Sequence, residues 1–527
     1  ACLAPAAHAR DATVNSFDGT PIITHFFPAD GLGPGERAPT IMVGHGWGGS
    51  GEEDPDSGSV GLYTSHGYNV LTWDARGFGQ SGGTVMIDSP DFEAKDAIAL
   101  IDFVARQPEA QLDGSRDPRL GMDGPSYGGG IQFLTAALDD RVDAITPTIA
   151  WHTLPRSLYQ RRVIKLGWDL ALVGLGIPTS VAEGVFSPAG VQTGHQSPEF
   201  YDAVVSGSST GSFPPDIVDF FKHRGPDYLL DRIEAPTLIV QGTVDTLFTL
   251  EEAHRNFRAL ERQGVPLKMM WYCGGHGVCL TERAGVGLTG SGGLVEDRKL
   301  AWFRRYLKDR ADVATGPKFE WLDERGRWHR ERGYPPEVGY RVRGQGSGDL
   351  ALPPGTLPPP VGSGALVFPA RAVPSPAALT VPIEKPPAGS EVIGVPRLKI
   401  AYRGQGVPVA GNRFEAFAQI VDRRRNIVVN NLASPIPLEL DGKRHEASLP
   451  LERIASVSTS EGYELQLVAS TSVYDVQRGT GNVSFQSIEV SLPVSGERPD
   501  DGEGGSGDGG RGGGGDEGGG RGDTGPE

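Results

Sequence analysis

The chain has 527 residues, of which 38% are hydrophobic and 22% charged, and it contains 76 Gly and 42 Pro. This length and balance indicate two or three domains with enough apolar residues for a sizeable core. A net charge of −17 argues against a general nucleic-acid-binding protein and against binding to anionic membranes. Because the sequence lacks a run of about 18 uncharged apolar residues, we expect no membrane-spanning helix.

The two ends of the chain differ in composition from its middle. Residues 1–9 end in Ala7-His8-Ala9, which is typical of the cleavage end of a secretory signal, with a disordered terminus as the alternative. We therefore expect a secreted, extracellular protein, and Cys2 leaves a lipid anchor open. Residues 496–527 are rich in Gly, Asp, Glu and Arg without a large apolar residue, so we expect a disordered tail.

The first 312 residues alternate short apolar runs with helical patterns. β-rich residues 13–17 and 21–27 flank Asp18-Gly19-Thr20, which predicts a hairpin. Helices are predicted over 89–107, capped by Ser89, and over 294–307. Buried strands are predicted at residues 40–43, 69–73, 120–122, 237–240 and 268–272. The alternation predicts an α/β domain over 10–312 with a mostly parallel sheet and helices on both faces.

Two regions depart from this rhythm. Residues 155–230 carry helix-like stretches at 158–177 and 214–230, which favours a helical cap inserted into the α/β domain. After residue 313, short β-rich runs are separated by Pro and Gly, which predicts an all-β, jelly-roll-like sandwich over 313–495. The predicted sandwich strands include residues 318–322, 365–368, 397–401, 414–421, 464–469 and 483–494.

A candidate nucleophile lies in Gly124-Pro125-Ser126-Tyr127-Gly128, between a predicted strand and a helical run. In a sharp strand-turn-helix connection, small flanking residues avoid clashes and the turn lifts the serine hydroxyl above the sheet edge. The N-terminus of the following helix favours developing negative charge. A Gly-rich turn without chemistry is the alternative, since this short pattern is common by chance.

A serine hydroxyl needs a base, and this fold places the acid and then the histidine after the serine. Asp245 follows the strand predicted at 237–240, and His276 follows the strand predicted at 268–272. Both positions lie at the carboxyl ends of strands, where open α/β sheets place their sites. The alternatives are that Asp245 caps the next helix and that His276 is a polar loop residue.

The attacked carbonyl would become an oxyanion that needs preorganised donors. We expect the backbone N–H of Tyr127 and that of Trp47, in the loop His45-Gly46-Trp47-Gly48-Gly49, to form this oxyanion hole. The glycines of the loop let the backbone approach a ligand closely. We expect His45 to be structural rather than catalytic.

Further candidates lie near the predicted site. Trp151 and His152 could line the substrate pocket, with packing under the cap as the alternative. Cys273 and Cys279 flank His276 and could form a disulfide in an oxidising compartment, with two separate thiols as the alternative. We find no convincing phosphate-binding loop or metal-ligand cluster, and we expect no metal and no cofactor.

Two motifs together resemble the X-prolyl dipeptidyl-peptidase family of serine peptidases, which also holds cocaine esterase and the α-amino acid ester hydrolases. They are residues 73–83 (WDARGFGQSGG) and 124–129 (GPSYGG). The resemblance covers about 13–495 and implies an α/β-hydrolase core, a helical cap and a sandwich, with Ser126, Asp245 and His276 as the triad. The family's arginine-containing loop corresponds to Asp74 and Arg76, and we expect that pair to brace the sheet edge beside the nucleophile without a catalytic role. Family members often use a tyrosine hydroxyl as one oxyanion donor, where this chain has Trp47.

These observations predict a secreted serine hydrolase that cleaves small carboxylic esters or amides through an acyl-enzyme. A first alternative, within the family, is an Xaa-Pro dipeptidyl-peptidase that acts on peptide N-termini. A second, of another class, is a catalytically silent binding protein that uses the sandwich. The expected partner is a small ester or amide or a short peptide, rather than nucleic acid.

Overall fold

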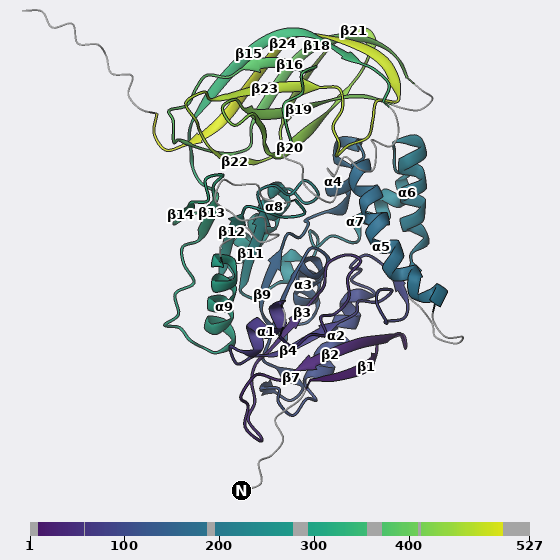
Figure 1. Ribbon diagram of the computed structural model, residues 1–527, viewed down its shortest axis with the longest axis vertical. Coiled ribbons are helices and arrows are strands. Elements are labelled where there is room, and N and C mark those ends of the chain that lie inside the picture. The colour runs from purple at the N-terminus through teal and green to yellow at the C-terminus, as the bar shows by residue number, and fades with distance from the viewer. Residues whose placement is uncertain are drawn as a thin grey trace, which may run out of the picture. The chain divides into compact units, whose positions relative to one another are not determined.

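The computed structural model describes residues 9–56, 58–186, 195–277, 293–355, 372–408 and 413–498, without the side chains of 177–186 and 195 (Figure 1). Within this part of the chain, residues up to 331 build a large twisted sheet. Its strands, in the order in which they pair, are β1 (Arg10–Asn15), β2 (Pro21–Phe27), β4 (Asn69–Trp73), β3 (Thr40–Val43), β8 (Leu120–Pro125), β9 (Val142–Thr148), β11 (Thr237–Gly242), β12 (Leu267–Tyr272), β13 (Phe319–Leu322) and β14 (Trp328–Glu331).

The sheet is parallel from β4 to β13 and antiparallel at its two ends. Successive side chains of a strand point to opposite faces, so the apolar runs are buried on both sides. Met42 and Leu71 pack on one face and Ile41 and Val70 on the other. The mostly parallel α/β sheet predicted from the sequence is confirmed.

Helices cover both faces of the sheet. On the face of Met42 lie α2 (Glu93–Val104), α3 (Tyr127–Leu138) and α8 (Leu250–Gln263), and on the face of Ile41 lie α1 (Gly58–Thr64) and α9 (Leu294–Leu307). The helix predicted over 89–107 is shorter than expected, because the Glu93 carboxylate accepts the backbone N–H groups of Met86 and Ser89 and holds that segment in a turn. Short two-strand pairs join β5 (Thr84–Val85) to β10 (His195–Gln196) and β6 (Leu112–Gly114) to β7 (Asp117–Pro118).

The insertion predicted at 155–230 is a helical cap. It contains α4 (Leu154–Leu158), the 3-10 turn η1 (Gln160–Arg162), α5 (Leu166–Phe186), α6 (Pro198–Thr210) and α7 (Pro215–Lys222), and a second 3-10 turn, η2 (Leu230–Arg232), returns the chain to β11. The helix expected over 158–177 is interrupted at Arg161 and Arg162, whose φ angles of 52° and 67° break the helical path. None of the described helices is both long and apolar enough to cross a membrane.

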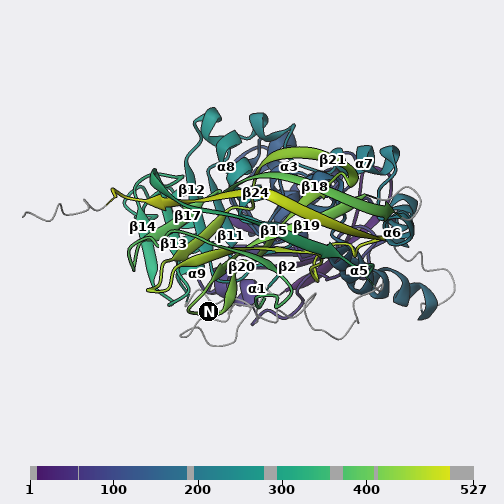
Figure 2. The same ribbon diagram turned by 90° about the horizontal axis from the view of Figure 1, so that it is seen from above.

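The C-terminal region is an antiparallel sandwich (Figures 1 and 2). One sheet pairs β15 (Val338–Leu352), β24 (Gly479–Ser495), β18 (Arg397–Pro408) and β21 (Asp441–Pro450). The other pairs β16 (Leu379–Pro382), β23 (Tyr463–Val468), β19 (Phe414–Asp422) and β20 (Ile427–Leu438), and β17 (Glu391–Gly394) pairs with β22 (Ile454–Val457). Both sheets contribute to one apolar core. The strand predicted at 365–368 and the tail after 498 lie outside the described residues.

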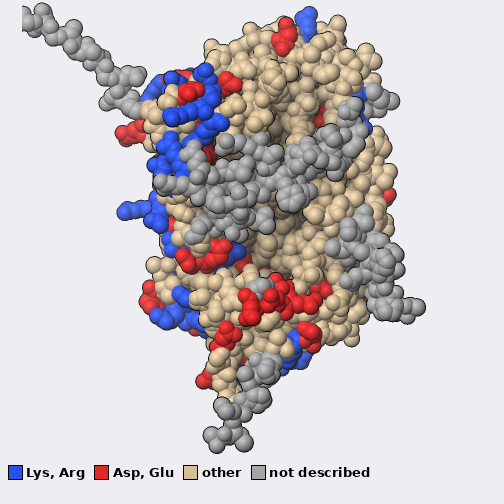
Figure 3. All heavy atoms as spheres, viewed as in Figure 1, with Lys and Arg blue, Asp and Glu red and all other residues tan. Residues whose placement is uncertain are grey.

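The boundary predicted at residue 313 differs from the structure. Residues 318–322 were expected to open the sandwich, yet β13 pairs in parallel with β12 and extends the large sheet. The prediction of this strand's location is wrong because a short β-rich run does not specify its pairing partner. On the surface, Figure 3 shows Lys and Arg side chains as well as Asp and Glu on the same face, so the net acidity is not a uniform negative coat on this face.

Candidate active site

Ser126 lies in the turn between β8 and α3, where the sequence places it. Its φ of 56° and ψ of −114° are strained for a residue with a side chain. The turn packs against the loop after β3 so closely that a Cβ on Gly128 would lie 2.2 Å from the carbonyl oxygen of Gly44. Glycine at this position is therefore required for the turn, which presents the Ser126 hydroxyl at the carboxyl edge of the sheet.

The structure brings Ser126, His276 and Asp245 together in one hydrogen-bonded chain. His276 Nε2 lies 2.7 Å from Ser126 Oγ, and His276 Nδ1 lies 2.7 Å from Asp245 Oδ2. The Asp245 carboxylate has only acceptors to offer, so Nδ1–H donates to it and Nε2 is left to accept the Ser126 proton. The three residues come from the ends of three strands of the sheet, β8, β11 and β12.

The carboxylate of Asp245 is fixed by several donors. Its Oδ1 accepts the backbone N–H groups of Leu247 and Phe248 at 3.0 and 2.8 Å. Its Oδ2 also accepts the N–H of His276 at 3.1 Å. The next loop approaches so closely that a Cβ on Gly275, which has a φ of 117°, would lie 2.5 Å from the Cβ of Asp245. The acid is therefore held in one orientation before any ligand binds.

Lys165, in the cap directly before α5, holds the loop that carries Asp245. The ammonium of Lys165 donates to the carbonyl oxygens of Thr246 and Leu247, both at 2.8 Å. Burial lowers the pKa of Lys165 to about 8. The indole of Trp168 donates to Thr246 Oγ1 at 3.0 Å. Lys165 and Trp168 of the cap thus position the loop of the acid Asp245. No sequence motif predicts these contacts.

The loop after β3 lies over the nucleophile. Within the described part of the chain, the backbone N–H groups of Trp47 and Tyr127 donate to no acceptor, as expected of donors kept for a ligand. The rings of Trp47 and Tyr127 pack edge-on at 5.5 Å, and the indole of Trp47 donates to the carbonyl oxygen of Leu172 at 2.9 Å. The placement agrees with the predicted oxyanion hole, whose role stays a prediction.

His45 is held inside this loop by its neighbours. Its Nε2 accepts the N–H of Ala75 at 2.9 Å, and its Nδ1 lies 2.7 Å from the carbonyl oxygen of Gly46, to which it donates. Burial lowers the pKa of His45, so the neutral ring fits both contacts. Both ring nitrogens are occupied, which agrees with the structural role expected for this residue.

The two residues of the motif at 73–83 brace neighbouring segments. Asp74 accepts the backbone N–H groups of Gly51 and Gln80 at 2.8 and 2.7 Å. Arg76 donates to both oxygens of Asp96 at 2.7 Å and to Asp18 at 2.9 Å. Asp74 and Arg76 therefore act on different partners rather than as one pair.

A cavity of about 60 Å³ opens beside Ser126, between the core and the cap. Most of its lining is apolar and includes Trp47, Leu154, Leu158, Leu172, Phe200 and Phe248. Trp151 lines this cavity, as predicted, and its indole donates to the carbonyl oxygen of Arg224 at 2.8 Å. His152 is not among the described lining residues, because its Nδ1 is bound to Asn256 Oδ1 at 2.8 Å. The expectation that His152 lines the pocket is therefore not met.

One carboxyl group interrupts the apolar lining. Asp169, on α5, is 8% exposed, and its Oδ2 has no hydrogen-bond partner within the described part of the chain. Burial raises the pKa of Asp169 well above its ordinary value, and Lys165 opposes this shift. A neutral carboxyl is the form that such surroundings favour.

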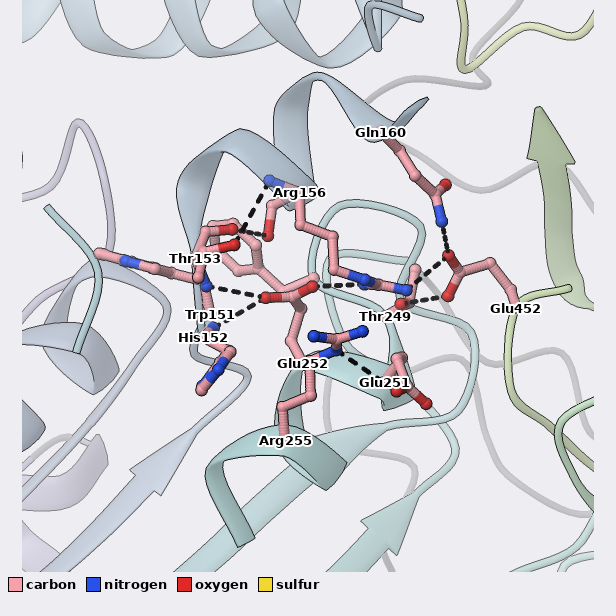
Figure 4. Close-up of polar contacts among 12 residues, drawn as sticks. Trp151, His152, Thr153, Arg156, Gln160, Thr249, Glu251, Glu252, Arg255 and Glu452 are labelled. Atoms are coloured by element: carbon pink, nitrogen blue, oxygen red, sulfur yellow. Dashed lines mark hydrogen bonds and ion pairs between the residues drawn. The ribbon is translucent and has the colours of Figure 1, made fainter. Parts of the chain in front are cut away.

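A buried ionic network, which sequence reasoning missed, lies behind the site (Figure 4). Arg156 of α4 pairs with Glu252 of α8 and, at 3.0 Å, with Glu452 of the sandwich. Glu452 also accepts a hydrogen bond of 2.6 Å from the Thr249 hydroxyl and one from Gln160. Burial alone would raise the pKa of Glu452, but Arg156 and Lys165 outweigh it and lower the pKa. Cap, core and sandwich are therefore joined directly behind the acid loop.

The remaining predicted site residues are the two cysteines. Cys273 is buried directly after β12, whereas Cys279 lies outside the described residues, so their pairing stays a prediction. Among the side chains that the structure describes, no three His, Cys, Asp or Glu gather as a metal-binding group.

The fold and the site define this protein as an α/β-hydrolase with a Ser-His-Asp arrangement. Residues 22–278 match the family model of the X-Pro dipeptidyl-peptidase (S15 family). The resemblance that the sequence motifs predict is thereby confirmed over the region that contains Ser126, Asp245 and His276.

Two solved structures share the fold over most of the chain. An α-amino acid ester hydrolase superposes with a TM-score of 0.67 at 14% identity, covering 93% of this chain and 98% of that one. A CocE/NonD family hydrolase from Staphylococcus aureus superposes with a TM-score of 0.60 at 13% identity, covering 93% and 97%. At these identities the likeness establishes the architecture of core, cap and sandwich alone.

A curated relative matches over a short region. An uncharacterized 31.7 kDa protein in the traX-finO intergenic region of Escherichia coli is 35% identical over 89 residues, which are 17% of this chain and 29% of that protein. The chain thus spans less than a third of the length of the curated relatives that it matches.

Proposed function

We propose that the protein is a serine hydrolase that cleaves carboxylic ester or amide bonds, with Ser126, His276 and Asp245 as its catalytic triad. The observation that carries this proposal is the continuous chain of hydrogen bonds, 2.7 Å from Ser126 Oγ to His276 Nε2 and 2.7 Å from His276 Nδ1 to Asp245 Oδ2. A nucleophile, a base and an orienting acid in this order form the minimal set for acyl transfer.

The mechanism follows from these contacts. Ser126 Oγ attacks the substrate carbonyl carbon while His276 Nε2 takes the hydroxyl proton. Asp245 holds the imidazole and stabilises its cation. The backbone N–H groups of Trp47 and Tyr127 bind the oxyanion. His276 then protonates the leaving group, the acyl-enzyme forms, and a water molecule activated by His276 releases the acid and restores Ser126.

Esters of small apolar acids are the substrates that the cavity favours. Its volume of about 60 Å³ and its Trp, Leu and Phe lining fit a short aliphatic or small aromatic acyl group. Such a group brings no polar atom of its own into the cavity, whereas a charged acyl group would lose its hydration there.

Release of Xaa-Pro dipeptides is the second candidate, supported by the family match over residues 22–278. This reaction would place the ammonium group of a peptide N-terminus on the acyl side, and Asp169 is the one carboxyl among the described lining residues that could face it. A silent binding protein is the third candidate, and the intact hydrogen-bonded triad argues against it.

Secretion is a further proposal, supported by residues 1–9 and by the proximity in sequence of Cys273 and Cys279. A disulfide there would restrain the loop of His276. Mass spectrometry of the protein under non-reducing conditions checks the pairing directly, because two separate thiols would each accept an alkylating group.

Initial rates on p-nitrophenyl butyrate and on Ala-Pro-p-nitroanilide, measured with the full chain and with Ser126→Ala, test the proposed function. We expect turnover of the ester, lost in the variant. Efficient release of the anilide would favour the peptidase instead. Ester turnover that survives Ser126→Ala would refute the catalytic role of this serine.

A further inference from the structure

A second cavity meets the site on the other side of His276. It has a volume of about 280 Å³ and is lined by His276, by Trp168 of the cap, by Thr246 of the acid loop and by residues of the sandwich. The ring of His276 lies between the two cavities. It contacts Phe248 of the apolar cavity edge-on at 5.1 Å and Trp168 of the second cavity edge-on at 5.8 Å.

The chemistry of the second cavity differs from that of the first. Polar but uncharged side chains contribute much of its lining, namely Thr246, Gln419, Asn431, Ser470, Thr471 and Ser472. They alternate with small apolar side chains such as Ala433 and Val473. Among its described lining residues none is Asp, Glu, Lys or Arg, so these residues offer hydrogen bonds but no counter-charge.

Several of these polar groups are held by the protein in a way that leaves a donor for a ligand. Thr246 Oγ1 accepts the indole N–H of Trp168, and Thr471 Oγ1 accepts the backbone N–H groups of Val473 and Tyr474. Each hydroxyl hydrogen therefore remains to donate. Asn431 Oδ1 accepts the N–H of Ala372 at 3.1 Å, which leaves the amide NH₂ of Asn431.

The position of His276 assigns the two cavities to the two parts of a substrate. The acyl group bonds to Ser126, which lines the apolar cavity, and the leaving group takes its proton from His276, which lines the polar one. A charged leaving group would be desolvated in the polar cavity without a compensating charge from its described lining residues, whereas hydroxyl groups would find partners there.

We propose that this second cavity, formed jointly by cap, core and sandwich, binds the leaving group and selects a neutral alcohol with several hydroxyl groups, such as a polyol or a sugar. The inference rests on the proposed serine hydrolase function and names its substrate class: esters of small apolar acids with polyhydroxy alcohols. Trp168 presents an aromatic surface to the C–H face of such an alcohol, and the Ser, Thr and Asn side chains present donors to its hydroxyl groups.

A series of esters with one acyl group tests the proposal. Glycerol monobutyrate, ethyl butyrate and butyrylcholine form the same acyl-enzyme, so their kcat/KM values differ only through the leaving group. After correction for their rates of hydroxide hydrolysis, we expect glycerol monobutyrate to exceed ethyl butyrate by about tenfold or more, as two or three added hydrogen bonds would give. Butyrylcholine should be no better than ethyl butyrate, because none of the described lining residues offers a counter-charge to its cation.

A variant locates this preference in the cavity. Ser472 is half-buried, so Ser472→Phe would fill the cavity, whereas the matched variant Ser484→Phe alters an exposed position on β24. Ser472→Phe should reduce the glycerol-to-ethyl ratio to near one, whereas Ser484→Phe should change neither this ratio nor the ethyl butyrate turnover. Ser472→Ala, a smaller change, should lower the ratio by about threefold.

The outcomes are distinguishable. A ratio near one in the unmodified protein, a preference for butyrylcholine, or a ratio that Ser472→Phe leaves unchanged would overturn the inference while the hydrolase function stands. Failure to turn over any ester, p-nitrophenyl butyrate included, would instead refute the proposed function and the inference with it.

Discussion

Two Asp-His pairs of the large sheet, Asp245 with His276 and Asp323 with His329, are built differently. Asp245 follows β11 and lies 2.7 Å from one nitrogen of His276, whose other nitrogen lies 2.7 Å from Ser126 Oγ. Asp323 follows β13 and lies 3.0 Å from one nitrogen of His329, whose other nitrogen lies 2.6 Å from Glu391 of the sandwich.

The second nitrogen of each histidine decides what the pair can do. His329 is held between two carboxylates, so both ring nitrogens donate and the ring is a cation. Burial alone would lower the pKa of His329, but its hydrogen bonds to Asp323 and Glu391 raise it to about 9. Its ring also stacks on Trp321 at 4.2 Å. His276 instead keeps one nitrogen for a hydroxyl beside two cavities, and can accept a proton. His329 uses both ring nitrogens for carboxylates of the protein, so this pair stabilises the fold. His276 uses one ring nitrogen for the Ser126 hydroxyl, so this pair can act on a ligand.

Asp245→Asn gives the largest expected change. An amide opposite His276 Nδ1 favours the wrong tautomer, so kcat for p-nitrophenyl butyrate should fall by about 10³ to 10⁴ with little change in melting temperature. Asp323→Asn is the matched control and should leave kcat within a fewfold. Equal losses of kcat in the two variants would contradict the distinction between the Asp245–His276 pair and the Asp323–His329 pair.

Arg156→Met removes the cation from the buried ionic network behind the site and leaves Glu252 and Glu452 buried together. The free energy of unfolding should fall by about 3–5 kcal/mol at neutral pH. Denaturant unfolding measures this loss. The exposed Arg310→Met is the control, since its pair with Asp312 lies on the surface. A loss of unfolding free energy below about 1 kcal/mol would contradict this expectation. It would mean that Glu252 and Glu452 can stay buried without Arg156 at little cost.

The pair of Asp323 and His329 should make the free energy of unfolding depend on pH. The pKa of His329 is raised to about 9 in the folded protein, above its value of about 6.5 when unfolded. Its contribution is therefore complete below pH 6.5 and is lost as the pH rises through 9. Allowing for solvent screening, we expect a loss of about 2 kcal/mol between pH 7 and 10. His329→Gln should flatten this part of the pH profile, and an unchanged slope would refute the cationic assignment.

Asp169→Asn gives the smallest expected change on the ester reaction. A carboxyl that burial keeps neutral resembles an amide in charge and size, so kcat/KM for p-nitrophenyl butyrate should stay within about threefold. The same variant separates the two candidate functions. If Asp169 binds the ammonium of a peptide N-terminus, release from Ala-Pro-p-nitroanilide would fall by about tenfold or more, as loss of a buried ionic hydrogen bond implies.

Much of the fold and the centre of the site could be predicted from the sequence. Ser126, Asp245 and His276 each follow an apolar run directly, and the carboxyl ends of parallel strands share one edge. The sequence also predicts the cap, because helical periodicity replaces the strand rhythm after residue 155. Each of these predictions depends on residues that are close together in the sequence, and such patterns can be recognised in a single sequence.

The contacts that no prediction reached are those between distant segments. Arg156 and Glu452 are 296 residues apart, and no spacing rule relates them. The polar cavity beside His276 combines residues of the cap, the acid loop and the sandwich, each unremarkable in its own segment. The pairing of β13 with β12 was missed for the same reason, since the run at 318–322 fits either sheet by composition.

The central claim is that Ser126 is the nucleophile of a triad with His276 and Asp245. Covalent labelling tests this claim most directly. A fluorophosphonate probe should add once per chain, with the adduct on the peptide that contains Ser126. Labelling should be absent in Ser126→Ala and strongly slowed in His276→Ala. An unlabelled native protein, or an adduct on another residue that persists in Ser126→Ala, would contradict the account.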